Sequence, residues 1–299
     1  MKFSVAIACG GHEHMLVACV RSVRARCDRS VPVHVCFDGF EPDAETLAVL
    51  AELGVGHTTF PENRGISAAW NAAARACIAA GGDLVFVLND DTEVHDGVDT
   101  LYLDFFERNP HVQVACSLDR LTGWSLIPEI QARHEKAWGF DKLQPNTTLA
   151  SPGIGIYGSQ GYRHYAEWVR GLPHPEFLRC RMNGAAMVWR AAALEEIGFF
   201  DEGYRAPGTH EDIHAYMQVL SKHGPDAMGT LTRSFVHHIR AATISNYPRD
   251  WAEARVAENS RRFAKAWRTP EHEPLWQWLC VVNALPVGGV EPAFPGGIT

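Results

Sequence analysis

The sequence has no long apolar run, no excess of basic residues and no recognisable export signal. None of its apolar stretches reaches the roughly 18 residues that a membrane-spanning helix requires. The N-terminal run "FSVAIAC" is followed by glycines and histidines too early for a signal peptide. A net charge of −8 argues against bulk attraction to nucleic acid or anionic membranes as the main binding force. We therefore expect a soluble, cytoplasmic protein.

Paired cysteine motifs are also missing. The chain has eight cysteines, none of them in a C-x-x-C pair, and several lie inside apolar runs such as "VHVCFD". This pattern favours buried, reduced thiols over a disulfide framework or a zinc cage.

The first 117 residues alternate strand-like and helix-like patterns. Short apolar runs predict strands, and apolar residues spaced three or four apart predict helices. The expected strands are 3–9, 33–38, 56–60, 84–89 and 112–117, and the expected helices are 15–27, 47–53, 66–80 and 97–109. Strands separated by helices predict an α/β fold with a doubly wound, mostly parallel sheet and helices on both faces. In such a sheet, ligands bind beyond the carboxyl ends of the strands.

The rest of the chain is less regular. Residues 119–178 are rich in proline, glycine and aromatic residues, and whether they form a functional loop or a passive insertion stays open. Strands 185–190 and 230–238 and helices 191–197, 210–223 and 249–267 are expected to follow. The basic helix at 249–268 favours packing on the domain, with docking to an acceptor or a membrane surface as the alternative. The last 16 residues are expected to form a flexible tail.

Two adjacent carboxylates follow the most apolar strand. In "VFVLNDDTEV", Asp90 and Asp91 come directly after the strand, and they repel each other unless a positive group lies near them. Mg²⁺ or Mn²⁺ carrying a diphosphate would supply that charge, because both ions prefer oxygen ligands. The alternative is a solvated turn in which one aspartate caps the next helix. Their place at the carboxyl end of a strand favours the metal.

Several blocks in this order resemble family 2 glycosyltransferases of the GT-A fold, in the style of the rhamnosyltransferase-like members. The blocks are "PENRGISAAWNAA" (61–73), "GGDLVFVLNDDTEV" (81–94), "NGAAMVWRAAALEEIGFFDEGY" (183–204), "HEDIHAYMQVLSKHG" (210–224) and the histidines of "VHHIRAATIS" (236–245). The family commonly has Thr-Tyr-Asn after the first strand, where this chain has "ACGGHEH".

The resemblance implies a Rossmann-like GT-A domain over residues 1–245. Residues 1–117 would form the nucleotide-sugar-binding half, and 118–245, with the insertion 119–178, the acceptor half. Residues 246–299 would add a C-terminal helix and the flexible tail.

The resemblance also implies roles for single residues. Asp38 would meet the nucleotide base or ribose, and Asn89 and Asp90 would contact the donor or its metal. Asp91 would be the principal metal ligand. The wall around the nucleoside and phosphates would be shaped by Asn63, Arg64, Gly65 and Asn71.

A histidine is expected to complete the metal shell. His237 and His238 are adjacent on a predicted strand, where neighbouring side chains point to opposite faces, so only one should reach the metal. We favour His237, because Val236 and His238 would share the other face. An imidazole ligand would favour Mn²⁺ over Mg²⁺.

The stretch "GTHEDIHAYM" can be interpreted in two ways. His210-Glu211-x-x-His214 matches the zinc-peptidase pattern H-E-x-x-H, but no third ligand follows at the expected spacing. In a transferase, Glu211 and Asp212 would lie at a helix N-terminus, whose dipole helps to keep carboxylates ionised. Asp212, with Glu211 beside it, could then deprotonate an acceptor hydroxyl. The second interpretation agrees with the other blocks.

We therefore expect an inverting, metal-dependent glycosyltransferase that uses a UDP- or dTDP-sugar. A nucleotide-sugar-binding protein without turnover and a nucleotidyltransferase are the alternatives. The acceptor hydroxyl stays open between a glycan, a lipid-linked sugar, a small molecule, a protein and modified nucleic acid.

Overall fold

The computed structural model describes residues 1–28, 30–119, 126–138, 161–180, 182–206, 208–239, 248–284 and 292–295. Residues 120–125 and 139–160 of the insertion, the stretch 240–247 and most of the expected tail lie outside the described residues.

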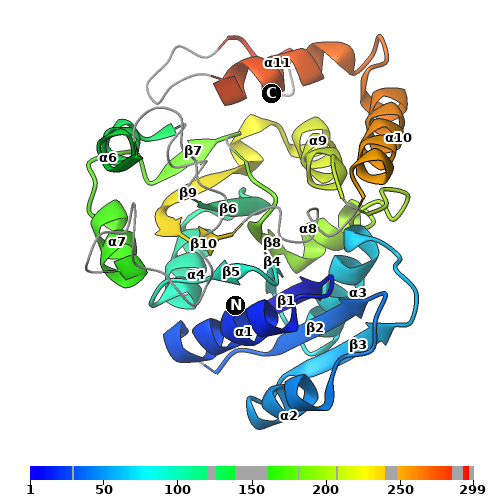
Figure 1. The fold of residues 1–299 in the computed structure, drawn as a ribbon. Coiled ribbons are helices and arrows are strands. Elements are labelled where there is room, and N and C mark those ends of the chain that lie inside the picture. Colours follow the sequence, from blue (N-terminus) through cyan, green and yellow to red (C-terminus); the bar gives the residue numbers. More distant parts are fainter. Residues whose placement is uncertain are drawn as a thin grey trace.

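One eight-stranded sheet runs through the molecule (Figure 1), in the order β3-β2-β1-β4-β8-β6-β9-β7. Its strands are β1 (Phe3–Cys9), β2 (Val33–Asp38), β3 (Gly56–Phe60), β4 (Leu84–Asn89), β6 (Val114–Leu118), β7 (Phe177–Arg179), β8 (Ala186–Arg190) and β9 (Met228–Phe235). The first four are parallel, whereas β8 runs antiparallel between β4 and β6. Strands β5 (Thr92–Glu93) and β10 (His237–His238) pair beside it. The predicted, mostly parallel sheet is confirmed.

Helices cover both faces of the sheet, as expected. The helices are α1 (Glu13–Arg26), α2 (Ala44–Glu52), α3 (Ile66–Ala79), α4 (Val98–Arg108), α6 (Pro128–Trp138), α7 (Gly161–Arg170), α8 (Ala191–Glu196), α9 (Glu211–His223), α10 (Arg249–Trp267) and α11 (Glu273–Ala284). Alternate residues of each strand point to opposite faces. In β4, Phe86 therefore packs in the core under α1, α2 and α4, whereas Val85 and Val87 pack in the core under α3, α8 and α9.

Residues 161–170 differ from the expectation of an irregular insertion. They form α7, which buries Tyr162, Tyr165, Ala166 and Val169 against β9. This spacing is helical, but two of its four residues are tyrosines, whose polar hydroxyls hid the pattern. The Tyr162 hydroxyl donates to the carbonyl of Phe235 over 2.6 Å, so Tyr162 lies inside the fold.

The C-terminal region holds two helices, not one. Helix α10 packs along α9, and α11 lies beyond it (Figure 1). The buried face of α11 contains Leu275, Trp278, Leu279 and Val282, again at helical spacing. No described helix is both long and apolar enough to cross a membrane. All eight cysteines are free thiols, and six of them are buried, in agreement with the sequence.

Candidate functional site

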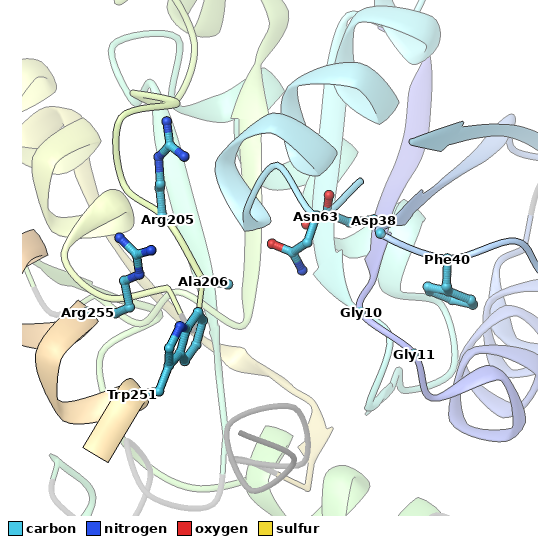
Figure 2. A pocket seen from close by; sticks show the side chains of 10 residues that line it. Gly10, Gly11, Asp38, Phe40, Asn63, Arg205, Ala206, Trp251 and Arg255 are labelled. Atoms are coloured by element: carbon cyan, nitrogen blue, oxygen red, sulfur yellow. The ribbon is translucent and has the colours of Figure 1, made fainter. Parts of the chain in front are cut away.

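A cleft of about 400 Å³ opens beyond the carboxyl ends of β1 and β2. Figure 2 shows two walls that face each other across it. The first wall comes from the segments after β1 and β2 and before α3, and it is lined by Gly10, Gly11, Asp38, Gly39, Phe40 and Asn63. The opposite wall comes from the loop before α9 and from α10, and it is lined by Arg205, Ala206, Trp251 and Arg255. The first wall includes Asp38 and Asn63, which the sequence analysis places on the donor.

The Asp38 carboxylate organises the first wall. It accepts the backbone N–H of Arg64 over 2.6 Å and that of Gly65 over 2.9 Å. Burial raises the pKa of Asp38, and these two N–H donors oppose that effect. Asp38 therefore holds the turn that begins α3 and also lines the cleft.

Two glycines allow the close approach of chain segments around this turn. Gly39 has φ +87°, and a Cβ atom there would lie 2.7 Å from the Cβ of Asn63. Gly65 has φ +93°, and its Cβ would lie 3.0 Å from the carbonyl oxygen of Tyr204. Gly65 thus lets the loop before α9 pack directly on the start of α3.

Asn71 and Arg64 lie away from the cleft lining, contrary to our expectation for the nucleoside wall. The Asn71 amide accepts the N–H of Phe200 over 2.9 Å and donates to the carbonyl of Phe200 over 2.8 Å. Asn71 also donates to Glu202, as does Arg64 over 3.1 Å. Both residues therefore tie the N-terminal half of the sheet to the "GFFDEG" turn. The buried N–H and carbonyl of Phe200 need a hydrogen-bond acceptor and a donor, and the amide side chain of Asn71 supplies both.

Asp90 and Asp91 lie at the end of β4, and both are buried. The Asp90 carboxylate accepts the N–H of Gly10 over 3.2 Å, which joins it to the cleft. Burial, together with the charge of Asp91, raises the pKa of Asp90 to about 7. The repulsion inferred from the sequence is therefore present.

His238 lies between two carboxylates. Its Nε2 is 3.3 Å from Oδ1 of Asp91, and its Nδ1 is 3.4 Å from Oδ2 of the fully buried Asp119. Burial disfavours the imidazolium, but the charge of Asp91 and the hydrogen bonds with Asp119 and Asp91 raise the pKa of His238 to about 9. Asn89 is also near, with its Nδ2 3.5 Å from Nε2 of His238.

The structure places His238 beside Asp91, whereas we favoured His237 as the metal ligand. The ring of His237 packs against Tyr162 with 6.0 Å between centroids, and His238 takes the place beside Asp91. Alternation was correct in placing the two rings on different sides. Counting from Val236 could not show which of the two rings faces Asp91, because β9 ends at Phe235 and the paired residues of β10 begin at His237.

The donor atoms of Asp91 and His238 fit a divalent cation. Two ligands that each lie about 2.1 Å from one octahedral ion are about 3 Å apart, close to the 3.3 Å measured here. The Asp119 carboxylate would accept a hydrogen bond from Nδ1 of this imidazole and so orient it, as carboxylates commonly do for metal-bound histidines. Among the described residues no group of three or more His, Cys, Asp or Glu side chains forms a complete metal centre. Phosphate oxygens and water would have to supply the remaining ligands, as is usual for Mg²⁺ sites.

Glu211 and Asp212 form the first turn of α9. Burial, together with the charge of Asp212, raises the pKa of Glu211 to about 8, and burial also raises the pKa of Asp212. We expected the helix N-terminus to keep both ionised, but the cost of desolvation is larger than the dipole effect. A Cβ atom on Gly184 would lie 2.2 Å from Oδ2 of Asp212, so glycine is required beneath this carboxylate.

Glu211→Gln is expected to stabilise the protein increasingly between pH 5 and pH 8. The wild-type pKa rises from the ordinary 4.5 to about 8 on folding, so the unfolded chain loses its proton first and stability falls as pH rises across this window. Glutamine removes that loss, and we expect a Tm gain on the order of 5 °C at pH 8. Thermal unfolding across this range measures it, with the exposed Glu195→Gln as control. An equal Tm gain at pH 5 and pH 8 would contradict this explanation.

The zinc-peptidase interpretation has no support in the structure. The ring of His210 packs against Phe263 of α10, with 5.3 Å between centroids. Nδ1 of His214 accepts the indole N–H of Trp267, also on α10, over 3.0 Å. The two imidazoles therefore serve helix packing.

Several residues of the site were not predicted from the sequence. Asp119 follows the end of β6, the same signal that identified Asp90 and Asp91 after β4. Trp251 and Arg255 are four residues apart on a helix that we assigned to packing. Only the fold shows that this face of α10 lines the cleft.

Two solved structures are similar to this chain. The structure of TarS 1–349 from S. aureus in complex with UDP has 13% identity and a TM-score of 0.47, covering 95% of this chain and 80% of that one. GalNAc-T7 with UDP, GalNAc and Mn²⁺ has 14% identity and a TM-score of 0.52, covering 79% of this chain but 43% of that one. No curated protein gives a significant match.

The match to a protein family covers more than half of the chain. The family described as "Glycosyl transferase family 2" matches residues 4–169, from β1 to the end of α7, and so includes Asp38, Asp90 and Asp91. The sheet order and the covering helices are those of the GT-A fold. The chain belongs to glycosyltransferase family 2.

Proposed function

We propose that the chain is an inverting, divalent-cation-dependent glycosyltransferase that moves a sugar from a UDP- or dTDP-sugar to an acceptor hydroxyl. The observation that carries this proposal is the pairing of Asp91 with His238 at the end of β4. Asp90, next in sequence to Asp91, is joined to the cleft through Gly10. GalNAc-T7, which shares the fold, was solved with UDP and Mn²⁺.

The first wall of the cleft would receive the nucleoside. Asp38 and Asn63 supply polar groups to the base or ribose, and Phe40 supplies an aromatic surface. The turn held by Asp38 keeps Asn63 in place before the ligand arrives, which reduces the entropy cost of binding. Gly10 and Gly11 have no side chains, so the ligand can approach their backbone closely.

Asp91 and His238 would hold the cation, Mn²⁺ or Mg²⁺, with Asp90 beside them. The bound cation supplies charge neutralisation for the departing diphosphate. The imidazole ligand favours Mn²⁺. Asp119 accepts a hydrogen bond from Nδ1 of His238, which leaves Nε2 available as the ligand atom.

Asp212 would act as the general base. Its raised pKa strengthens it as a proton acceptor compared with an ordinary aspartate. It takes the proton of the acceptor hydroxyl as the acceptor oxygen bonds to the anomeric carbon and the bond from that carbon to the diphosphate breaks. A single displacement from the opposite side inverts the anomeric configuration.

We also propose that the segments of the chain have the roles that the family resemblance implies. Residues 1–117 would supply most of the donor side and 118–245 most of the acceptor side, while 246–299 would add a C-terminal helix, α10, that also lines the cleft. Both halves contribute strands to one sheet, so we expect them to unfold together.

Thermal shift with UDP and dTDP, each with and without Mn²⁺, tests the function. At 100 times Kd a ligand stabilises the native state by about 2.7 kcal/mol, which corresponds to a Tm rise of several degrees. Slow Mn²⁺-dependent hydrolysis of the matching nucleotide sugar should follow. If neither nucleotide shifts Tm in the presence of Mn²⁺, the proposed donor class is wrong.

A further inference from the structure

Two guanidinium groups and an indole line the cleft wall opposite Asp38. Figure 2 shows Arg205, Arg255 and Trp251 on that side of the cleft, across from Asn63 and Asp38. The chain carries a net charge of −8, so two cations on one wall of a cleft are a local departure from its overall charge. Among the described residues that line the cleft, Asp38 is the only acidic one, and its carboxylate already binds two backbone N–H groups.

A buried side chain fixes the position of Arg205. Asn259 of α10 is 2% exposed, and its amide accepts the N–H of Arg205 over 3.3 Å and donates to the carbonyl of Arg205 over 3.0 Å. It also donates to Thr209. The loop before α9 is therefore attached to α10 through the backbone of Arg205 and the hydroxyl of Thr209, so the described contacts of Asn259 do not use the Arg205 side chain. The described ion pairs of this region use Arg64, Arg255 and Arg262.

Helix α10 presents Trp251 and Arg255 from one face. The guanidinium of Arg255 lies over the Trp251 ring at 5.5 Å and pairs with Glu258 over 2.7 Å. Trp251 is 37% exposed, which is unusual for such a large apolar side chain. The opposite face buries Phe263 and Trp267 against the core, so the helix is held rigidly.

We propose that α10 and the loop before α9 form a second wall of the donor site, in which Arg205 and Arg255 bind the phosphate groups of the nucleoside diphosphate and Trp251 covers its nucleoside. Guanidinium groups form strong paired hydrogen bonds to phosphate oxygens. An indole stacks on any base. Both ligand groups belong to one molecule, and both kinds of side chain lie in one cleft with the residues that would receive the nucleoside.

This inference rests on the proposed function and extends it to residues outside the family match. The family match ends at residue 169, whereas the second wall begins at Arg205. The C-terminal helix then completes the donor site, in addition to packing on α9. An anionic acceptor is the other ligand that such a wall could bind, and the experiment below separates the two.

The test compares the affinities of UDP and uridine by calorimetry with saturating Mn²⁺, and repeats this with dTDP and thymidine if those bind better. Arg205→Ala and Arg255→Ala should each raise the Kd of the diphosphate about tenfold and change that of the nucleoside less than about twofold. Trp251→Ala should weaken both ligands about tenfold. Arg261→Ala is the matched control, because it removes the same charge from an exposed position of α10 outside the cleft.

Each outcome decides the inference. If Arg205→Ala and Arg255→Ala both bind UDP and dTDP like the wild type, the second wall does not bind the donor, and a selective rise in acceptor KM would assign it to the acceptor. An equal loss for Arg261→Ala would show only a general charge effect. If the wild type binds neither nucleotide, the proposed function fails as well. The unliganded Tm of each variant checks folding, because Arg205, Trp251 and Arg261 are exposed and Arg255 is half-buried.

Discussion

Asp212→Asn is expected to lower kcat by about 10³-fold while leaving the Kd of the nucleoside diphosphate within about twofold of the wild type. The substitution keeps the size of the side chain and its place above Gly184 but removes the carboxylate that we propose as the general base. Oδ1 of Asp212 accepts the N–H of Ile213 over 2.8 Å, and the asparagine oxygen can accept it equally well, so α9 should be retained. Single-turnover transfer and calorimetry with UDP measure the two quantities separately.

Glu211→Gln is the matched control at the neighbouring position. With a pKa of about 8, Glu211 is mostly protonated at pH 7, and glutamine resembles that neutral form. We expect it to keep kcat within about tenfold of the wild type at pH 7. If Glu211→Gln abolishes transfer and Asp212→Asn does not, the base is Glu211. If neither variant loses activity, neither carboxylate is the base.

The pH profile gives an independent check on the base. A base must be deprotonated, and burial raises the pKa of Asp212. Activity should therefore fall as the pH drops through a value above the ordinary range of an aspartate, and Asp212→Asn should lose this limb of the profile.

The central strands of the sheet were predictable because they are buried on both faces. Strands such as 3–9 and 84–89 appear as continuous apolar runs between turn residues, and the structure places them at those bounds. Polar residues at the carboxyl end of a parallel strand lie at the ligand edge, so Asp38 and the Asp90–Asp91 pair could be located before their neighbours were known.

The parts that could not be predicted depend on contacts between distant segments. Asn71 looked like a ligand residue, and only the fold shows that it binds the backbone of Phe200, 129 residues later. The raised pKa values of Glu211 and Asp212 depend on burial, which the position of the pair at a helix N-terminus does not reveal. The second wall of the cleft required the docking of α10, which Asn259 fixes through Arg205.

The choice between His237 and His238 shows the same limit on a smaller scale. In β10, His238 pairs with Thr92 and His237 with Glu93 of β5. The N–H of Ile239 donates to the carbonyl of Asp91 over 3.1 Å. This pairing brings His238 next to the residue that follows Asp91. Counting along the strand gives the alternation of side chains but not the partner strand that fixes its phase.

Asp91→Ala is expected to remove the Mn²⁺ dependence of UDP binding altogether, because it deletes the carboxylate that His238 faces at 3.3 Å. His238→Gln should weaken Mn²⁺-dependent binding by about 10- to 100-fold, and Asp119→Asn by about tenfold, since loss of an outer partner of a metal-bound histidine commonly costs that much. His237→Gln is the matched control and should change binding less than about twofold. Calorimetry of UDP binding with and without Mn²⁺ measures all four variants.

The four variants together test the metal site and not merely the fold. Asp91, Asp119 and His237 are buried and the His238 side chain is only 11% exposed, so loss of stability alone would weaken UDP binding in the presence and in the absence of Mn²⁺. Replacing a metal ligand should weaken only the Mn²⁺-dependent part of UDP binding. If His237→Gln loses that part and His238→Gln keeps it, the geometry has been misinterpreted and the ligand is His237. If Asp91→Ala retains Mn²⁺-dependent binding, the cation is held elsewhere, and the role proposed for the end of β4 is wrong.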